Sequence, residues 1–593
     1  MLATLLCLCA TVGQPQADEM PWVQVAKDKK SFVLEPSEQP FTPWGFNYDH
    51  ATEGRLIEDY WDKEWDKVEA HFGQMKRLGA NVVRLHLQVA KFMDAGDKPN
   101  ENALDRLTKL VGLAEKERLY LDVTGLGCYH KADVPAWYDK LSEKDRWDVQ
   151  ARFWEAVANR CAKSPAIFCY DLMNEPVVPG GKRKDGDWLG PPFGGKHFVQ
   201  VITLDQQKRP RPDIARQWVK QLVAAIRKHD KRHLVTVGLV DWSLDRPGLT
   251  SGFVPDKIAD DLDFISVHLY PEKGKVEEAL KTLAGFDVGK PIVIEETFPL
   301  KCSVEEFGQF VEKSKKHAAG WIGFYWGKPP EELRKGKTIH DAIMLAWLEF
   351  FQKNAPTRFS AAECEGYYPM HLQGICTDDK DAIFWCFTDA LVKTDAKGKL
   401  LKKIPVKSHH GDLCHHDGKI YVALNLGKFN EPKGMADSWV YVYDAKDLSL
   451  LKKHEVQQVV HGAGGIAYHD DRFFVVGGLP KGVEENYVYE YDRQFKFIKT
   501  HVLKSGYTLL GIQTATFANG HFWFGCYGGK LLKADPSLKL IGSYDFDCGL
   551  GIVGIQNEQF LVARGPRVPD KGFTGSAVIA VMDAKKGLLI QGK

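Results

Sequence analysis

Two apolar segments of the sequence each lead into carboxylic acid side chains. Residues 166–174 are followed by Glu175, and residues 291–294 are followed by Glu295 and Glu296. Cleavage of a glycosidic bond uses two carboxyl groups, one that protonates the leaving oxygen and one that attacks the sugar carbon or activates water. These segments can supply such a pair if the fold brings their ends together.

Eight strand-like segments alternate with helix-like segments between residues ~40 and ~350, which is the pattern of a (β/α)8 TIM barrel. A doubly wound sheet is the alternative, but no G-x-G-x-x-G loop follows the first strand. In a barrel, catalytic groups lie at the C-terminal ends of strands. The predicted strands are Trp44–Tyr48, Asn81–Leu87, Leu119–Gly125, Ile167–Asn174, His233–Leu239, Asp263–Leu269, Pro291–Glu296 and Gly320–Trp326.

The predicted helices and loops fit this frame. Thr338 and Asp341 form a capping-box signature at the start of the last predicted helix. The segment after strand four, residues 177–213, is long and rich in Gly, Pro and Lys. Because loops after barrel strands form the active-site face, we expect it to wall the cleft, with a surface insertion as the alternative.

In this setting the sequence resembles the clan A retaining glycoside hydrolases, and most closely glycoside hydrolase family 5, the cellulase and mannanase family. The resemblance covers the ~310 residues of the predicted barrel and rests on several motifs in the expected order. They are Gly79-Ala-Asn-Val-Val-Arg84-Leu, Asn174-Glu175-Pro176, Val267-His268-Leu-Tyr270-Pro, Lys290-Pro-Ile-Val-Ile-Glu-Glu296 and Trp326.

The resemblance implies that Glu175 is the general acid/base and Glu296 the nucleophile of a double displacement. Side chains alternate along a strand, so only one of Glu295 and Glu296 should face the barrel mouth. Members of the family with a Glu-Glu pair here use the second, and we therefore predict Glu296. A carboxylate on the surface at a strand end is the alternative for either residue.

The resemblance also implies supporting roles. Asn174 would bind the sugar 2-hydroxyl, Arg84 and Tyr270 would hold the nucleophile, His268 would support the pair, and Trp326 would stack beneath the sugar. Each also has a structural alternative. Arg84 could be a structural ion-pair partner, His268 a hydrogen-bonded core histidine, and Trp326 an ordinary core residue.

Trp242, just past strand five, is a further candidate platform for a sugar ring, and a core or surface position is its alternative. The family pattern is broken at Thr297, where an aromatic residue usually follows the nucleophile, at Thr124, where strand three lacks the common histidines, and at His86. The sugar and the linkage are therefore left open.

After residue ~366 the helical period stops and short apolar strands with Gly, Asp and Asn turns repeat every 40–50 residues. Five such units predict a five-bladed β-propeller, with a β-sandwich as the alternative. The predicted organisation is a signal peptide at 1–17, the barrel at 18–352, a linker at 353–366 and the all-β domain at 367–593.

His371, His410 and His461 recur near the starts of successive repeats and would approach the channel of a propeller. A metal or ligand site is one interpretation, and polar filling of the channel is the favoured one. The scattered cysteines include no C-x-x-C pair, so we expect neither a metal nor a cofactor.

The composition narrows the choice of partner. A net charge of +1 gives no reason to expect nucleic acid, and no segment has the ~18 apolar residues of a membrane-spanning helix. The apolar N-terminal run is typical of a signal peptide, so we expect a secreted or periplasmic protein.

Together these features predict a secreted retaining glycosidase that cleaves β-glycosidic bonds of an oligo- or polysaccharide. The all-β domain would bind glycan or another protein. The alternative is a carbohydrate-binding or interaction protein with little or no activity, in which that domain is the main functional module. The presence of both carboxylates, Glu175 and Glu296, argues for the enzyme.

Overall fold

The computed structural model describes residues 20–50, 53–246, 248–325, 327–356, 359–378, 382–555 and 559–591. The chain divides into two compact units, residues 1–356 and residues 357–593. The predicted signal peptide and Trp326 lie outside the described residues. In the described part of the chain, no helix has the length and apolar character needed to cross a membrane.

The first unit contains a closed barrel of eight parallel strands in the order β12-β13-β14-β15-β4-β5-β8-β9, and the (β/α)8 prediction is confirmed. Each predicted strand corresponds to one barrel strand. Their bounds are Trp44–Tyr48 (β4), Val82–Gln88 (β5), Tyr120–Gly127 (β8), Ile167–Asn174 (β9), Leu234–Val240 (β12), Ile265–His268 (β13), Ile292–Glu296 (β14) and Gly320–Phe324 (β15).

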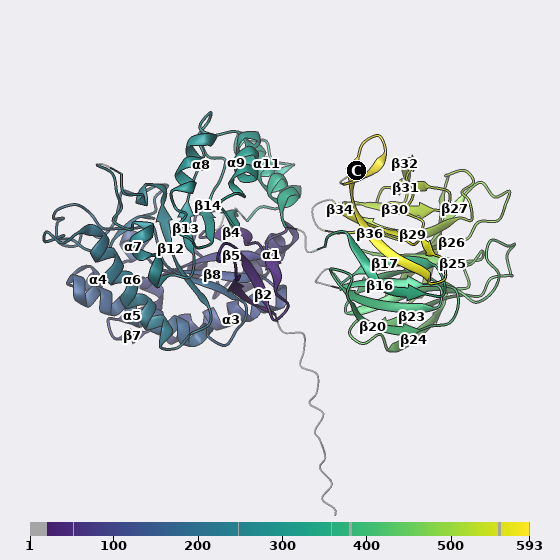
Figure 1. The fold of residues 1–593 in the computed structure, drawn as a ribbon, viewed down its shortest axis with the longest axis horizontal. Helices are drawn as coiled ribbons and strands as arrows, with labels where there is room; N and C mark the ends of the chain where they lie inside the picture. The colour runs from purple at the N-terminus through teal and green to yellow at the C-terminus, as the bar shows by residue number, and fades with distance from the viewer. Residues whose placement is uncertain are drawn as a thin grey trace, which may run out of the picture. The chain divides into compact units, whose positions relative to one another are not determined.

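Helices cover the outside of this barrel (Figure 1). Strand β9 is buried at every position, which explains why its sequence is largely apolar apart from Asp171 and Asn174. The last helix begins as predicted, because the side chain of Thr338 accepts a hydrogen bond from the backbone N–H of Asp341 at 3.0 Å. The long helices are Trp65–Arg77 (α1), Glu101–Glu117 (α3), Glu143–Cys161 (α5), Arg211–Arg227 (α6), Val276–Ala284 (α8), Val304–Ser314 (α9) and Ile339–Asn354 (α11).

A small antiparallel sheet that the sequence pattern did not predict precedes the barrel. It consists of Trp22–Val25 (β1), Phe32–Glu35 (β2) and Gln39–Phe41 (β3). Phe32 packs edge-on against Phe168 and Phe264, which lie at the starts of their barrel strands. The sheet therefore covers the N-terminal end of the barrel and leaves the C-terminal end for the site.

The second unit is built from five antiparallel sheets. One edge strand of each sheet contacts an edge strand of the next in a closed ring, from β17 through β21, β25 and β29 to β33 and back to β17. This arrangement is consistent with the predicted propeller. These strands are Leu372–Thr377 (β17), His410–His416 (β21), Ala463–His469 (β25), Ile512–Ala518 (β29) and Ile552–Gly554 (β33).

The remaining strands complete the sheets. β16 (Ala362–Tyr368), from the start of the unit, pairs with β36 (Gly572–Asp583), from its end, so one sheet joins both ends of the domain. Four sheets have four strands each. Their outer strands are Ala382–Phe387 (β18), Ala390–Asp395 (β19), Leu400–Pro405 (β20), Lys419–Asn425 (β22), Ser438–Asp444 (β23), Leu450–Glu455 (β24), Arg472–Gly477 (β26), Asn486–Asp492 (β27), Phe497–Leu503 (β28), His521–Cys526 (β30), Lys530–Ala534 (β31) and Leu540–Asp545 (β32).

Candidate active site

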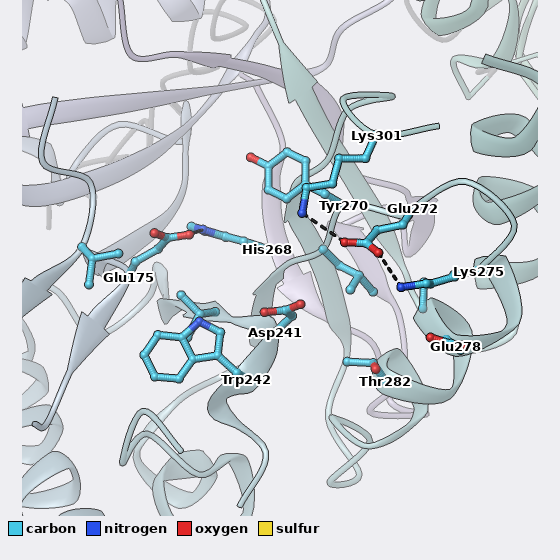
Figure 2. A pocket seen from close by; sticks show the side chains of 14 residues that line it. Glu175, Asp241, Trp242, His268, Tyr270, Glu272, Lys275, Glu278, Thr282 and Lys301 are labelled. Atoms are coloured by element: carbon cyan, nitrogen blue, oxygen red, sulfur yellow. Dashed lines mark hydrogen bonds and ion pairs between the residues drawn. The ribbon is translucent and has the colours of Figure 1, made fainter. Parts of the chain in front are cut away.

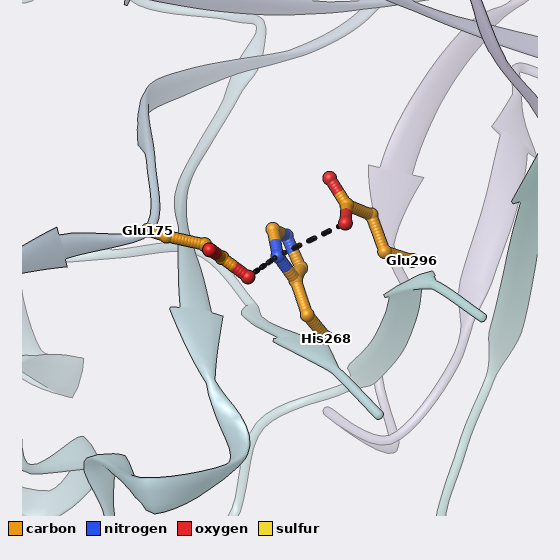
Figure 3. Close-up of side chains that lie close together, drawn as sticks. All are labelled: Glu175, His268 and Glu296. Carbon is orange, nitrogen blue, oxygen red and sulfur yellow. Dashed lines mark hydrogen bonds and ion pairs between the residues drawn. The ribbon is translucent and has the colours of Figure 1, made fainter. Parts of the chain in front are cut away.

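Glu175 and Glu296, the predicted catalytic pair, meet at the C-terminal end of the barrel. One carboxylate oxygen of each lies within 4.8 Å of the other, and a ring nitrogen of His268 lies within the same distance of both (Figure 3). Both side chains remain partly open to solvent, with 17% and 11% of their surface exposed. Two carboxyl groups about 5 Å apart are the spacing that double displacement at a sugar carbon requires.

Glu175 follows β9 in a left-handed backbone conformation, with a φ of 48°. Such a conformation costs a residue with a side chain roughly 1–2 kcal/mol. Its backbone N–H donates to the carbonyl of Gly238 on the neighbouring strand β12 at 3.0 Å. Pro176 follows and cannot continue the ladder of hydrogen bonds. The turn thus lifts the carboxyl group out of the strand and into the barrel mouth.

His268, at the end of β13, stands between the two carboxyl groups. Its Nδ1 lies 3.0 Å from Oε1 of Glu175 and 3.4 Å from Oε2 of Glu296. Burial opposes a charge on the ring, but the neighbouring carboxylates outweigh it and raise the pKa of His268 to about 10. The imidazole is therefore a cation at neutral pH and carries an N–H on both nitrogens.

Arg84, on β5, is fully buried and binds the predicted nucleophile directly. Its Nη1 donates to Oε1 of Glu296 at 2.7 Å, while the hydroxyl of Tyr270 donates to Oε2 at 2.8 Å. Burial raises the pKa of the Glu296 carboxyl group, and the positive charges of His268 and Arg84 oppose that rise. The hydrogen bonds fix both oxygens of Glu296.

Two asparagines hold Arg84 in place. The side-chain oxygen of Asn47, on β4, accepts from Nη1 at 2.9 Å, and that of Asn174 accepts from Nη2 at 3.1 Å. Asn174 also donates to the carbonyl of Phe198, in the loop after β9, at 3.0 Å. His86, where the family pattern is broken, lies 3.1 Å from Asn47 through Nε2. Asn47 is a site residue that the sequence analysis missed.

Glu295 is fully buried, so the alternative of a surface carboxylate does not hold for this residue. The β13–β14 register shifts at this point, since Val267 pairs with Ile294 but His268 pairs with Glu296. Such a bulge interrupts the alternation of side chains. As a result Glu295 also reaches Arg84, at 3.4 Å, behind the nucleophile.

Two further buried acids join Glu295 beneath the pair. Asp171 accepts from Nη2 of Arg84 at 2.6 Å, and Asp122 has a carboxylate oxygen within 4.8 Å of both other acids. Burial, reinforced by Glu295, raises the pKa of Asp122 well above its ordinary value, which favours the protonated form of this group. A metal ion bound here would compete with the guanidinium of Arg84.

A cleft of about 330 Å³ extends away from Glu175 and His268. Figure 2 shows Asp241 and Trp242 along it and a charged cluster at the far side, where Glu272 accepts from Lys275 at 2.8 Å and from Lys301 at 3.1 Å. Glu296 does not line this cleft, whereas Trp242 does, and its role as a sugar platform stays a prediction. The other lining residues are Val199, Val240, Leu269, Tyr270, Glu278, Ala279 and Thr282.

The three recurring histidines of the second unit do not form a shared site. His410 is buried and lies 2.7 Å from both the carbonyl of Lys407 and the hydroxyl of Tyr443. His371 lies 3.0 Å from the side chain of Gln373, and His461 lies 2.8 Å from a backbone carbonyl. Among the described residues, none of them belongs to a group with metal-binding geometry.

The match to a known protein family falls within the first of the two units. The family model for cellulase (glycosyl hydrolase family 5) matches residues 36–328, a range that contains all eight barrel strands. Mannan endo-1,4-beta-mannosidase A of Podospora anserina is 26% identical over 276 residues, which cover 41% of this chain and 64% of that enzyme. The enzyme of the same name from Emericella nidulans is 26% identical over 240 residues, 37% of this chain and 53% of that enzyme. The chain thus spans less than two thirds of the length of either relative.

Solved structures of related proteins also align with part of the chain. The endo-1,4-beta-mannanase of Rhizomucor miehei is 20% identical, with a TM-score of 0.38, and the alignment covers 51% of this chain and 90% of that one. The beta-1,4-mannanase of the sea hare Aplysia kurodai is 19% identical, with a TM-score of 0.38, covering 54% of this chain and 99% of that one.

Proposed function

We propose, from the premise that the barrel of this chain belongs to glycosyl hydrolase family 5, that the protein is a retaining glycosidase that cleaves β-glycosidic bonds. The observation that supports this most is the meeting of Glu175, His268 and Glu296 within 4.8 Å at the C-terminal end of the barrel. A spacing of about 5 Å leaves no room for a water between the carboxyl groups and the sugar, as inversion would need.

In the first proposed step, Glu296 attacks the anomeric carbon while Glu175 gives its proton to the departing oxygen. A glycosyl ester on Glu296 results, and the leaving sugar departs as an alcohol. Arg84 and Tyr270 support this step because their hydrogen bonds keep the attacking carboxylate ionised and aligned.

In the second step, water attacks the same carbon from the face that the leaving group vacated. Glu175, now a carboxylate, takes the proton of that water, and the bond to Glu296 breaks. His268 supports the exchange of roles, because its Nδ1 lies within reach of both carboxyl groups. Two inversions at one carbon give a product that retains the β configuration.

For the substrate, we propose a β-1,4-linked mannan, because the curated relatives carry the name mannan endo-1,4-beta-mannosidase. The cleft is lined by Glu175, the proposed acid, and not by Glu296, which supports its use on the leaving-group side of the bond. Trp242 would stack against a sugar there, and Asp241 would accept hydrogen bonds from its hydroxyls.

Asn174 and Trp326 complete the proposed sugar site as the family resemblance implies. Asn174 would reach the 2-hydroxyl, and Trp326 would stack beneath the ring that is attacked. The second unit would bind glycan or another protein, and the N-terminal apolar run would export the protein. The alternative of a non-catalytic binding protein predicts that substitutions at Glu175 and Glu296 leave every activity unchanged.

The proposal is tested with the full chain on mannan and on aryl β-mannosides, with cellulose and aryl β-glucosides in parallel. Glu175→Gln and Glu296→Gln should each lower kcat by at least about 10²–10⁴-fold. Glu312→Gln, an exposed substitution on α9, is the matched control. The anomer of the first product is read by NMR. Equal activity in wild type and both variants would exclude the enzyme, and an α product would exclude Glu296 as nucleophile.

A further inference from the structure

Behind the catalytic pair, three polar groups converge on one small space beside Gly238. A Cβ atom at this glycine would lie 3.0 Å from Nη2 of Arg84, 3.0 Å from Nε2 of His268 and 3.2 Å from Oε2 of Glu295. The absence of a side chain on this position of β12 is what allows the three groups to approach one another. The convergence involves Glu295, which the proposed mechanism does not use.

Glu295 is held by one of its oxygens and faces the cations with the other. The hydroxyl of Ser266 donates to Oε1 at 3.0 Å. Oε2 lies 3.4 Å from Nη2 of Arg84 and 3.5 Å from Nε2 of His268. Neither Oε2 nor Nε2 makes a closer hydrogen bond to any group that the structure describes. A buried imidazole N–H with no partner is costly, and Oε2 of Glu295, 3.5 Å away, can supply the acceptor, alongside the interaction of Glu295 with Asp122.

The opposite nitrogen of the same ring faces the reaction. Nδ1 of His268 lies 3.0 Å from Glu175 and 3.4 Å from Glu296, so it is within reach of whichever carboxyl group is ionised. During double displacement the negative charge resides first on the nucleophile and then on the acid/base. One N–H can follow this charge with a small tilt of the ring, provided that the other nitrogen is anchored.

We propose that Glu295 is the positioning residue that anchors His268 through Nε2, so that the Nδ1–H of the imidazolium stabilises Glu296 before the sugar is transferred and Glu175 afterwards. The inference rests on the proposed function. No proton leaves His268 in either step, and Glu295 touches neither substrate nor the reacting atoms. It acts only through the orientation and charge of the ring.

The electrostatics of the cluster agree with this role. Burial alone would raise the pKa of Glu295, but Arg84 and His268 outweigh it and lower the pKa to about 2. Burial and the charge of Glu295 raise the pKa of Asp122 well above its ordinary value, while Asp171 and Glu295 both face the guanidinium of Arg84. The charged and titratable groups around His268 are Glu175, Glu295, Glu296, Arg84 and His86.

The first test compares Glu295→Gln with wild type in the full chain. Glutamine keeps the volume and an acceptor for Ser266 but removes the charge. We expect kcat to fall about 10- to 150-fold, the effect of losing a hydrogen bond to a charged group, with little change in KM. The alkaline limb of the kcat/KM profile, which follows ionisation of the proposed acid Glu175, should move, because Glu175 contacts the His268 ring whose charge and orientation Glu295 controls. A merely structural role would lower activity without moving this limb.

The second test follows His268 itself by NMR of histidine-labelled protein, with the signal assigned from His268→Asn. The titration midpoint of His268 should fall in Glu295→Gln. It should remain as in wild type in Ser266→Ala, because that variant keeps the charge of the Glu295 carboxylate. If Glu295→Gln does not fold, Gly238→Ala is the second variant: its Cβ would lie 3.0 Å from Nε2 of His268 and 3.2 Å from Oε2 of Glu295, so these groups must shift and the His268 midpoint should change.

An unchanged alkaline limb and an unchanged midpoint in a folded Glu295→Gln protein would overturn the inference. A wild-type protein without glycosidase activity would instead overturn the proposed function, while the NMR titration would still measure the coupling of Glu295 to His268.

Discussion

His268 in the barrel and His410 in the second unit are both buried histidines at the end of a strand, yet their pKa values move in opposite directions. Burial lowers the pKa of His410 to about 4. Burial also acts on His268, but the carboxylates around it raise its pKa to about 10. Exposure alone, 3% and 0%, does not distinguish the two rings.

The difference lies in the partners. His410 contacts two uncharged groups, the carbonyl of Lys407 and the hydroxyl of Tyr443, which suit a neutral ring with one donor and one acceptor nitrogen. His268 contacts carboxylates through both nitrogens, which suits the cation. A buried histidine therefore indicates function only when the charges around it are known.

The largest expected effect is on kcat, which substitution of His268 should lower and substitution of His410 should not. His268→Asn should lower kcat about 10- to 150-fold or more, because both carboxyl groups lose a charged donor. His410→Asn should leave kcat unchanged, since His410 lies in the other unit. Steady-state kinetics on the substrate that wild type cleaves best checks this, and similar losses in both variants would contradict the comparison.

The next effect is the alkaline instability of the barrel. The folded pKa of His268, about 10, lies above its ordinary value of 6.5, so its contribution to stability is complete below pH 6.5 and is lost as pH rises through 10. Hydrogen exchange of the β13 and β14 amides should accelerate across this range in wild type, after correction for the intrinsic pH dependence. A wild-type protein whose corrected exchange is flat from pH 7 to 10 would refute the assignment of a cation.

The effect at His410 is smaller and has the opposite sign. Its folded pKa of about 4 lies below 6.5, so its contribution is complete above pH 6.5 and is lost as pH falls through 4. A shift of this size corresponds to up to about 3 kcal/mol. Protection of the β21 and β22 amides should decline between pH 6.5 and 4, and His410→Gln should reduce this decline.

The smallest effect concerns Asp412 on β21, a buried acid that accepts from the backbone N–H of Ala515 at 2.9 Å. Burial raises its pKa well above 3.8, so its contribution to stability is complete at low pH and is lost as pH rises through the folded pKa. Asp412→Asn should remove this loss and change stability at pH 4 by only about 1 kcal/mol.

In the barrel, Asp171→Asn should instead destabilise the fold, because Asp171 is the partner of Arg84.

Much of the barrel and of its site was predictable because the relevant signals are local. Apolar runs marked all eight strands, and carboxylates at two strand ends marked Glu175 and Glu296. The (β/α)8 rule then required that strand ends share one face of the barrel. The network around Asn47, Asp122 and Asp171 was not predictable, because each of these residues reads as an ordinary polar position in a strand.

Three features of the site depend on neighbouring strands. The alternation of side chains predicted that Glu295 and Glu296 face opposite ways, and a bulge against β13 brings both to Arg84. In the left-handed turn at Glu175, the backbone N–H of this residue donates to the carbonyl of Gly238 on β12. The role of Gly238 becomes visible only in the tertiary structure, where Arg84, His268 and Glu295 surround the space that its missing side chain leaves.

The sequence by itself predicted the class of fold from its periodicity and two catalytic carboxyl groups from the residues that end each strand, with the family resemblance choosing Glu296 over Glu295. Only the tertiary structure decided the charge of each buried group. The pKa of His268, His410, Glu295 or Asp122 depends on the sum of burial, hydrogen bonds and charges within a few ångströms. These partners come from strands that are distant in sequence, and no local pattern records them.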